Sequence, residues 1–477
     1  MYKGAYKMKA EHSLFVTMLV LLLGGFLSLL NETILNVALF PIMSEMNVTA
    51  TMVQWLSTGY VLIVAIMVPI SAFLIYTFTT KKLYLGAMGI FGLGTLAAVF
   101  SPDFMVLVLA RMIQALGTGL LAPIMIDTAL ASYPRQQHGY IMGICTCVIL
   151  IGPAAGPIIS GLVLQFFTWR ALFVLLLPFI LFCIGGGMIY LKNVIPCSKP
   201  KIDRISITLS TIGFSFLVYG ISIVSSDCNW RDILIIFSIG IVSIIFFCKR
   251  QLGLREPMLN ITAFRKTYFS VCALLVIVVQ MVQFSINIVL PLLLEKGMQL
   301  TSLQAALTLF PAVLVCSAVT PISGRLYDHI GGKKIIPAGI LIMGFGLLVL
   351  ARIQISSSVL LIALFNMIIY LGIALAWSPM QSHALKQLSL SKQAHGVAII
   401  NTFIQLGSAL GTPLFVGLMD AGERKYIAQY AGKLTDSSLY IHALYSGFHY
   451  SISNAAILIG IAFLFSLLLN IKIRLRS

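Results

Sequence analysis

Residues 171–191 read ALFVLLLPFILFCIGGGMIYL, an apolar run without a charged side chain. At 1.5 Å per residue, a helix of this length crosses the roughly 30 Å hydrocarbon core of a bilayer. Similar runs recur from Leu14 to Leu469, and the whole chain is 59% hydrophobic and 9% charged. An average soluble domain has about 45–50% apolar and about 25% charged residues. The sequence therefore predicts an all-α integral membrane protein and excludes a soluble enzyme.

The apolar runs divide the 477 residues into fourteen predicted membrane spans. Between them lie segments of at most about 20–30 residues, which leaves no separate soluble domain, so the function must lie within the membrane part. An even number of spans places both termini on the same side. The spans are predicted at 14–40, 52–76, 83–100, 104–131, 140–166, 171–191, 206–224, 233–248, 268–294, 303–326, 335–351, 358–384, 396–419 and 450–471.

The net charge of +17 comes from 31 Lys and Arg against 14 Asp and Glu. If the N-terminus is cytoplasmic, most of the basic residues fall in segments that face the cytoplasm, as the positive-inside rule requires. This bias supports the number of spans and places both termini in the cytoplasm. A basic face beside anionic lipid explains the charge, and no basic run alternates with aromatics as in single-strand binding. We expect the bilayer of the cytoplasmic membrane as a partner, and no nucleic acid.

Other common signals are missing from the sequence. The first apolar run continues to Met43 without a small-residue cleavage site, so it is interpreted as a retained span and not as a signal peptide. The eight cysteines are scattered and predict neither a disulfide framework nor a metal site. No GxxxxGK[ST] motif is present, which argues against ATP as the energy source.

The chain contains an internal repeat. Residues 31–41 read NETILNVALFP and residues 283–291 read QFSINIVLP, each with Asn, two residues, Leu and then Pro. The segment 71–82 corresponds in the same way to 323–334, at nearly the same offset. Duplication with two extra spans predicts two six-helix bundles, residues 1–192 and 267–477, joined by two linker spans within 193–266.

Three motifs extend this pattern. Residues 324–334 read GRLYDHIGGKK, residues 111–117 read RMIQALG, and residues 152–157 read GPAAGP with Gly161 beyond. In this order and spacing they resemble the loop, fourth-span and fifth-span motifs of the fourteen-span drug:proton antiporters of the major facilitator superfamily.

That resemblance implies a major facilitator fold that exports lipophilic drugs or antibiotics by alternating access while protons enter. It implies a transporter and not an enzyme, with no cofactor other than the coupling proton. The alternative is a dedicated exporter of one metabolite, lipid or antibiotic, such as a tetracycline, by the same mechanism.

The sequence departs from the family pattern at several positions. The first-half loop motif has Ala72 and Tyr76 where the family usually has Gly and Asp, which suggests that its gating role has passed to the second copy. Ala115 replaces a usual Gly, and Asn31-Glu32 is similar to the version found in fourteen-span tetracycline exporters.

Glu32, Arg111 and Asp127 are the ionisable residues placed at membrane depth. Each costs about 2.5–3.5 kcal/mol on insertion scales and therefore marks a candidate site. Glu32 and Arg111 lie at similar distances from the outer ends of their spans, so we expect them to form a charge pair. Our hypothesis is that Glu32 binds substrate when ionised and a proton when empty. The alternative is a permanent ion pair that only orients helices.

Asp127 is predicted near the inner interface. The resemblance implies a contact with the loop after the second span, through Lys81 or Lys82, so that Asp127 is a conformational latch, a proton relay or a lipid-interface residue. The repeat aligns Glu32 with Gln283, so protonation is expected in the N-terminal bundle alone. A single acid favours small lipophilic substrates that are neutral or monocationic.

Amide side chains are the candidates for the substrate cavity. Gln280, Gln283 and Asn287 share one helical face, which either lines a wet cavity or bonds to neighbouring helices. Both roles are open for the others as well. Trp55, Tyr60 and Trp377 either stack on a flat substrate, anchor at the membrane interface or pack within the protein. The remaining cavity candidates are Asn31, Asn36, Gln114, Asn366, Asn401 and Gln405.

The fifth-span motif predicts a bent helix that approaches another closely, because glycine lacks bulk and proline lacks a backbone donor. The resemblance assigns it to a gate between the bundles, and residues 407–413, GSALGTP, have the same small-residue spacing. The predicted gating residues are Gly152, Pro153, Gly156, Pro157, Lys81, Lys82, Gly324 and Asp328. Neither the substrate nor the oligomeric state follows from the sequence.

Overall fold

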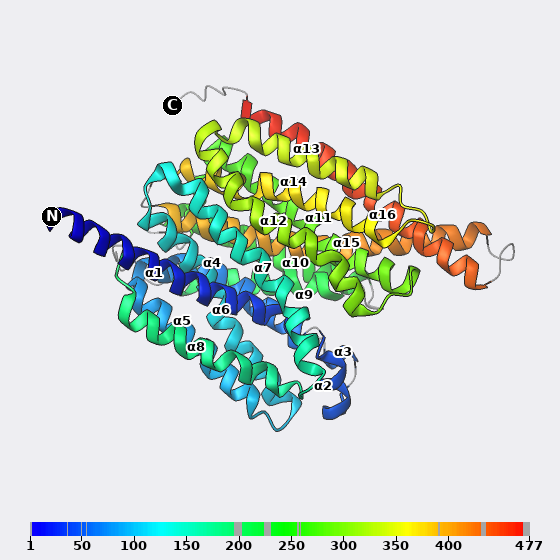
Figure 1. Cartoon of the computed structure of the whole chain (residues 1–477), viewed down its shortest axis with the longest axis horizontal. Helices are drawn as coiled ribbons and strands as arrows, with labels where there is room; N and C mark the ends of the chain where they lie inside the picture. Colours follow the sequence, from blue (N-terminus) through cyan, green and yellow to red (C-terminus); the bar gives the residue numbers. More distant parts are fainter. Residues whose placement is uncertain are drawn as a thin grey trace. The chain divides into compact units, whose positions relative to one another are not determined.

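The computed structural model describes residues 2–194, 203–223, 230–254, 257, 259–389, 392–430 and 436–470, except for 36, 49 and 54. These residues form helices and short connections, and no strand occurs among them (Figure 1). Each predicted span overlaps one long helix. In chain order these are α1 (Tyr2–Thr33), α4 (Trp55–Thr77), α5 (Thr80–Val99), α6 (Phe104–Ser132), α7 (His138–Leu164), α8 (Arg170–Tyr190), α9 (Arg204–Ile223), α10 (Trp230–Gly253), α11 (Thr267–Leu292), α12 (Ser302–Ile330), α13 (Gly332–Leu350), α14 (Val359–Lys386), α15 (Gln393–Tyr430) and α16 (Asp436–Leu467).

Most of these helices are long and apolar enough to cross a bilayer. Within the described ranges eleven meet this criterion, or twelve if α4, which bends by 52° between Val68 and Ile70, counts as one span. The apolar part of α9 is short, covering Arg204–Leu217, and α15 is not among the eleven. The structure therefore supports a multi-pass membrane protein, and the number of fourteen crossings stays a prediction.

The first predicted span is wrong in one respect, because 14–40 is not a single helix. Helix α1 ends at Thr33, the described residues between 34 and 38 form turns, and a short helix α2 (Leu39–Met46) follows. A further short helix, α3 (Ala50–Val53), leads into α4.

The loop predicted between 419 and 450 is also partly helical, since α15 continues to Tyr430 and α16 already begins at Asp436. The two extensions pack on each other: a Cβ added to Gly422 would lie 2.8 Å from the Cα of Gly447. The ring of Tyr426 stacks on His442 with centroids 6.3 Å apart. These contacts stabilise helical turns that the apolar pattern does not indicate.

The chain forms two compact units. The first comprises 1–219, 234–262 and 388–402, and the second comprises 220–233, 263–387 and 403–477. The predicted domain boundaries at 192 and 266 stay a prediction.

Equivalent helix pairs recur in both units, as duplication requires. In the first unit α6 packs against α1, α4 and α5, and α8 packs against α1 and α5. In the second unit α14 packs against α11, α12 and α13, and α16 packs against α11 and α13. Glycines allow these helices to approach closely at corresponding places. In the first unit, a Cβ added to Gly117 of α6 would lie 2.5 Å from the carbonyl oxygen of Ala87 on α5. In the second unit, a Cβ added to Gly372 of α14 would lie 2.6 Å from the carbonyl oxygen of Gly339 on α13.

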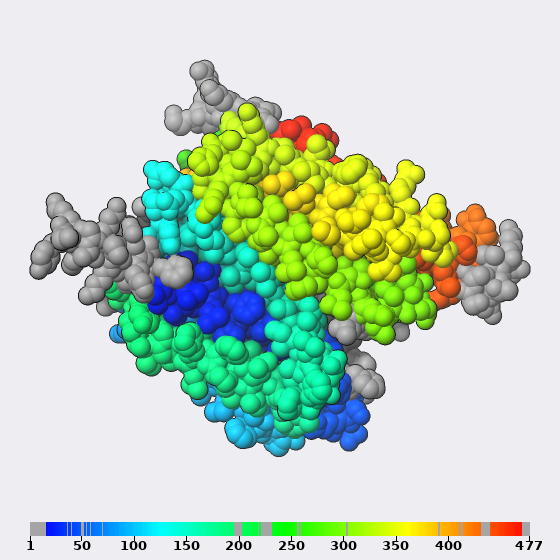
Figure 2. Space-filling model, in the orientation of Figure 1, coloured from blue at the N-terminus to red at the C-terminus, as the bar shows by residue number. Residues whose placement is uncertain are grey.

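Apolar side chains cover the outer faces of both units. On α8, Leu181 is 67% exposed and Ile189 is 74% exposed, and on α13, Leu341 and Phe345 are more than half exposed. Figure 2 shows α8 of the first unit, in blue-green, at the surface, and it also shows α13 and α14 of the second unit, in yellow-green and yellow, at the surface. Such surfaces suit hydrocarbon chains and would be unfavourable in water.

Helices α9 and α10 form a closely packed pair. A Cβ added to Gly213 would lie 2.6 Å from Ile244, and one added to Gly240 would lie 3.0 Å from Leu217. Small residues at such crossings let helices approach closely within a membrane. On the first unit, Tyr219 of α9 stacks on Trp55 of α4 with ring centroids 6.2 Å apart. Trp55 therefore packs on one side against α9 and stays partly exposed in this structure.

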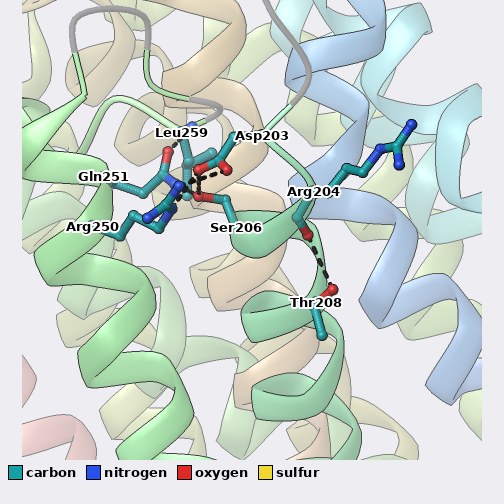
Figure 3. A network of polar contacts seen from close by, with 7 residues as sticks. All are labelled: Asp203, Arg204, Ser206, Thr208, Arg250, Gln251 and Leu259. Atoms are coloured by element: carbon teal, nitrogen blue, oxygen red, sulfur yellow. Dashed lines mark hydrogen bonds and ion pairs between the residues drawn. The ribbon is translucent and has the colours of Figure 1, made fainter.

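A polar network joins the start of α9 to the end of α10 (Figure 3). The charge bias predicts that these two ends face the cytoplasm. The carboxylate of Asp203 accepts hydrogen bonds from Nε of Arg250 at 2.6 Å and from its Nη2 at 2.9 Å. Ser206 donates to the same carboxylate, and Gln251 donates to Ser206. The amide N–H of Leu259 donates to Gln251 at 3.0 Å, which attaches the following segment to the same network.

Asp203→Asn should destabilise the protein in a pH-dependent way. Hydrogen bonds from Arg250 lower the pKa of Asp203 to about 2, against an opposing effect of partial burial. Because this pKa is depressed, the ionised carboxylate stabilises the folded state at neutral pH, and this stabilisation is lost as the pH falls from about 4 toward 2. The thermal unfolding temperature of the purified variant should lie below that of the original protein at pH 7, with the difference closing near pH 2. A difference independent of pH, or an equal effect of Asp232→Asn at an exposed position of α10, would contradict this assignment.

Candidate functional site

The end of α1 carries Glu32 in a partly buried position. The helical hydrogen-bond series ends where Ile34 N–H donates to the Leu30 carbonyl at 3.0 Å. The carbonyl oxygens of the last helical turn therefore need other donors. One neighbouring helix, α6, supplies a donor to such a carbonyl, and a second, α7, bonds to α1 beside it. Together with the end of α1 they define the candidate site.

Arg111 of α6 binds the end of α1. Its Nη1 donates to the Asn31 carbonyl oxygen at 3.2 Å and to Oε1 of Gln114 at 2.9 Å. Arg111 is 1% exposed, and its guanidinium lies 4.1 Å from the ring centroid of Tyr60. A cation at a helix C-terminus is favoured by the helix dipole and by the unpaired carbonyls. Arg111 is therefore a cap of α1 from another helix.

Tyr60 connects three helices around this guanidinium. Its hydroxyl lies 2.6 Å from Oγ1 of Thr118 on α6 and accepts from Nδ2 of Asn31 on α1 at 3.3 Å. Gln114 also donates to Thr95 of α5 at 2.8 Å. Tyr60 and Gln114 are fully buried, so in this structure both connect helices and neither faces a cavity.

The predicted ion pair between Glu32 and Arg111 is not formed. Among the described residues no hydrogen bond or ion pair within 4.0 Å reaches the Glu32 carboxylate, although the charge of Arg111 acts on it through space. The reason is that the guanidinium is occupied by the Asn31 carbonyl, by Gln114 and by the Tyr60 ring. Its Nη2 is buried and has no partner within the described residues.

Helix α7 packs on the same end of α1. An added Cβ at Gly152 would lie 2.9 Å from Cβ of Leu29, and one at Gly156 would lie 2.2 Å from Oγ1 of Thr33 and 3.0 Å from the Ile34 nitrogen. The glycines of the fifth-span motif thus allow α7 to approach another helix closely, as predicted. Within the described residues that helix is α1, in the same unit.

A proline explains the polar contact at this crossing. Pro157 has no N–H, so the Pro153 carbonyl four residues earlier lacks its usual helical donor. Oγ1 of Thr33 donates to that carbonyl oxygen at 2.7 Å. The last residue of α1 is therefore bonded to α7 at the Pro153 carbonyl, and it directly follows Glu32 in the chain.

The second unit repeats the packing and lacks the charges. Gly411 of α15 approaches α11, with an added Cβ 2.3 Å from the Met281 carbonyl oxygen, yet α11 continues unbroken to Leu292. In the first unit Gly94 faces the backbone nitrogen of Gln114, and in the second unit Gly346 faces that of Ile369 in the same way. Gln114 and Ile369 therefore occupy equivalent positions. Three residues before these positions lie Arg111 in the first unit and the buried, neutral Asn366 in the second. The described part of the second unit thus has no cation at the position equivalent to Arg111 to bind a freed carbonyl.

At the predicted inner end, Asp127 is 5% exposed. No hydrogen bond or ion pair reaches it from any residue in the described ranges. The predicted contact with Lys81 or Lys82 is wrong: Nζ of Lys81 donates to the Met188 carbonyl at the end of α8, and Lys82 is exposed. Both lysines lie in the first turn of α5, where the Lys81 side chain reaches across to α8.

Instead, Tyr76 lies within electrostatic range of Asp127. The Tyr76 ring packs on His395 with centroids 5.0 Å apart, and Arg135 donates to the Leu388 carbonyl at 3.5 Å. Residues 388–402, which include the start of α15, accordingly belong to the first unit. Tyr76 stands where the second repeat has Asp328, so this copy of the loop motif makes aromatic contacts in place of an ion pair.

The second loop motif forms the ion pair that the first lacks. Asp328 of α12 binds Nζ of Lys386 on α14 at 3.2 Å, and Tyr327 beside it bonds to His383 at 3.3 Å. Gly331 between α12 and α13 has φ +77°, a conformation that favours glycine. Gly324 is buried within α12.

The other amide candidates divide by exposure. Gln280 is buried and donates to Ser408 of α15 at 2.8 Å, and Asn401 donates to a carbonyl of its own helix. Gln283 is 6% exposed with Oε1 unpaired in the described structure. Asn287 is exposed and accepts from the Tyr370 hydroxyl, and Gln405 is partly exposed. Asn36 lies outside the described residues, and Trp377 is buried.

Thr33 was not predicted from the sequence, and for Tyr60 the sequence left substrate stacking and core packing open without predicting which helices Tyr60 connects. The signal for Thr33 was present, because the spacing of Pro153 and Pro157 leaves a carbonyl without a donor and a hydroxyl is a natural partner. No comparable pattern in the sequence indicates the helices that Tyr60 connects.

Outside the predicted spans, Glu45 of α2 fixes the segment that follows the break. Its carboxylate pairs with Arg170 and accepts from Nε1 of Trp169 at 2.7 Å. The hydrogen bond from Arg170 lowers the pKa of Glu45. The outer continuation of α1 is thereby attached to the start of α8.

The family model described as Major Facilitator Superfamily matches residues 21–412, which is more than half of the chain. The chain belongs to the Major Facilitator Superfamily. As a member of this superfamily it is a multi-pass transporter of the cell membrane and not an enzyme.

Two curated relatives of this superfamily member are lincomycin resistance proteins LmrB. The protein of Bacillus subtilis is 36% identical, over 88% of this chain and 89% of its own, and that of Listeria monocytogenes is 35% identical over 85% and 86%. Among solved structures, the human organic anion transporter MFSD10 has a TM-score of 0.65 over 95% of this chain and 99% of its own, at 10% identity. This last likeness concerns the fold alone.

Proposed function

We propose that this member of the Major Facilitator Superfamily exports small lipophilic drugs or antibiotics in exchange for protons, with Glu32 as the protonation site. The observation that carries the proposal is the position of Glu32. It is an acid beside the break of α1, next to a buried arginine with one unpaired donor. Discontinuous helices at membrane depth commonly form the binding sites of secondary transporters.

The coupling follows from competition at this carboxyl. When Glu32 is ionised and the site is empty, its carboxylate can take the free Nη2 donor of Arg111. When a proton or a cationic group of the substrate neutralises the carboxylate, that attraction is lost and the end of α1 can adopt the arrangement described above. Proton and substrate then occupy the site in alternation, as exchange requires.

The names of the relatives support an antibiotic as substrate. Two relatives that cover most of this chain are described as lincomycin resistance proteins. The second unit has the neutral Gln283 and Asn366 where the first has Glu32 and Arg111. A substrate with one positive charge or none therefore matches the single acid better than a dication does.

Export from proteoliposomes that contain the purified full-length chain tests this function. An inwardly directed pH gradient should drive export of lincomycin and of the monocation ethidium. Each pH unit supplies about 1.4 kcal/mol, enough for about a tenfold concentration ratio. Exchange of a monocation for one proton moves no net charge, so a membrane potential alone should leave ethidium export unchanged. The dication propidium should be exported more slowly.

Two outcomes would count against the proposal. Export that persists after a protonophore collapses the pH gradient would exclude proton coupling. Transport confined to a single compound across a chemically varied panel would favour the dedicated exporter.

A further inference from the structure

We infer that Thr33 is a positioning residue for Glu32, acting through the Pro153 carbonyl that Pro157 leaves without a helical donor. The inference rests on the proposed role of Glu32 and adds a residue that neither the motifs nor the comparisons assign. The hydroxyl of Thr33 donates to that carbonyl at 2.7 Å, and Thr33 is the last residue of α1.

The local geometry leaves little freedom for this end of α1. Gly156 provides the space in which Thr33 reaches α7, because an added Cβ there would lie 2.2 Å from the Thr33 hydroxyl oxygen and 3.1 Å from the Leu30 carbonyl oxygen. On the other side, Arg111 holds the Asn31 carbonyl at 3.2 Å. Glu32 lies between these two attachments, one to α6 and one to α7.

The two attachments differ in kind. The one from Arg111 carries a charge that also acts on Glu32, whereas the one from Thr33 is neutral and depends only on distance and direction. Loss of the Thr33 bond should therefore leave the charges of the site unchanged and alter the position of the carboxyl relative to Arg111. Among the described residues, the titratable groups that act on Glu32 are Arg111 and Tyr60, and both remain in place.

The proline makes this arrangement testable by a double-mutant cycle. In Pro157→Ala the new N–H at 157 lies where a helix donates to the Pro153 carbonyl, so it competes with the Thr33 hydroxyl. If Thr33 acts through this carbonyl, Thr33→Val should have its full effect in the original background and little further effect beside Pro157→Ala. Residues that act through one bond show such non-additivity.

The readout is the pH dependence of lincomycin export by the full-length chain in proteoliposomes. Thr33→Val, which keeps the shape and removes the hydroxyl, should shift the midpoint of this profile by about 0.5–1 pH unit, the shift expected from one lost hydrogen bond. Thr33→Ser keeps the hydroxyl and should restore the original midpoint. Thr17→Val is the matched control, because Thr17 lies on the same helix and donates to the Tyr190 carbonyl of α8 at 3.0 Å.

Each outcome decides between the two proposals. An unchanged midpoint in Thr33→Val, an equal shift in Thr17→Val, or full additivity with Pro157→Ala would overturn the positioning role. If instead Glu32→Gln keeps the pH dependence of the original protein, the role of Glu32 fails first, independently of Thr33. A variant with low yield is assayed by the pH profile of the folded fraction, because the midpoint does not depend on the amount of protein.

Discussion

Export by the Glu32→Gln variant is expected to lose its dependence on a pH gradient completely, while the protein still folds and inserts. The amide keeps the size of the side chain and removes the proton exchange. The second repeat carries glutamine at this position and supports a continuous helix, so the residue itself is compatible with the fold. Proteoliposomes with and without a pH gradient provide the measurement, with substrate exchange in the absence of a gradient as the readout for intact binding.

Glu45→Gln is the matched control for this variant. It neutralises an acid in the segment that continues α1, where the carboxylate pairs with Arg170. Its pH-driven export should match that of the original protein, apart from a modest loss of stability, as expected for an exposed ion pair. Gradient-driven export that survives in Glu32→Gln but disappears in Asp127→Asn would move the protonation site to Asp127.

Gly156→Leu should abolish transport, and Gly156→Ala should reduce it at least tenfold. Even a Cβ at this position would overlap the Thr33 hydroxyl and press on the backbone of α1 at Ile34 and Leu30. Overpacking of this kind costs about 1–3 kcal/mol and forces backbone shifts, here at the residues beside Glu32. Export rates per folded molecule, normalised to the amount of reconstituted protein, provide the measurement.

Gly161→Leu serves as the control on the same helix. An added Cβ at Gly161 would have no heavy atom within 4 Å, so the substitution introduces bulk without overlap near the residue. Its export rate should be close to that of the original protein. Full activity of Gly156→Leu, or an equal loss in Gly161→Leu, would show that the close approach of α7 and α1 is not required.

Much of the architecture could be predicted because it depends on patterns within short segments. Apolar runs locate every long helix, and the offset between repeats anticipates the helix pairs that recur in the two units. The break of α1 could not be predicted in this way. Residues 284–291 of α11 resemble 33–41 in their β-branched and Asn content, yet α11 remains helical.

Contacts that are distant in the sequence account for the difference. The Asn31 carbonyl is bound by Arg111, which lies 80 residues away, and Thr33 binds Pro153, which lies 120 residues away. Tertiary contacts of this kind override local propensity. The site could likewise be predicted only in part. Spacing placed Glu32 and Arg111 at a similar depth in the membrane, but it could not indicate that the Arg111 guanidinium binds the main-chain oxygen of Asn31.

The interruption after Thr33 has no counterpart in α11, and this difference constrains how such a molecule can be assembled. Two copies of the first half would carry two acids at the position of Glu32 and two interrupted helices, and two copies of the second half would carry neither. Fusion of the unlike halves in one chain gives each molecule a single acid at the position of Glu32. Under the proposed function, the peptide connection would therefore limit each transporter to one such protonation site, in addition to holding the halves together.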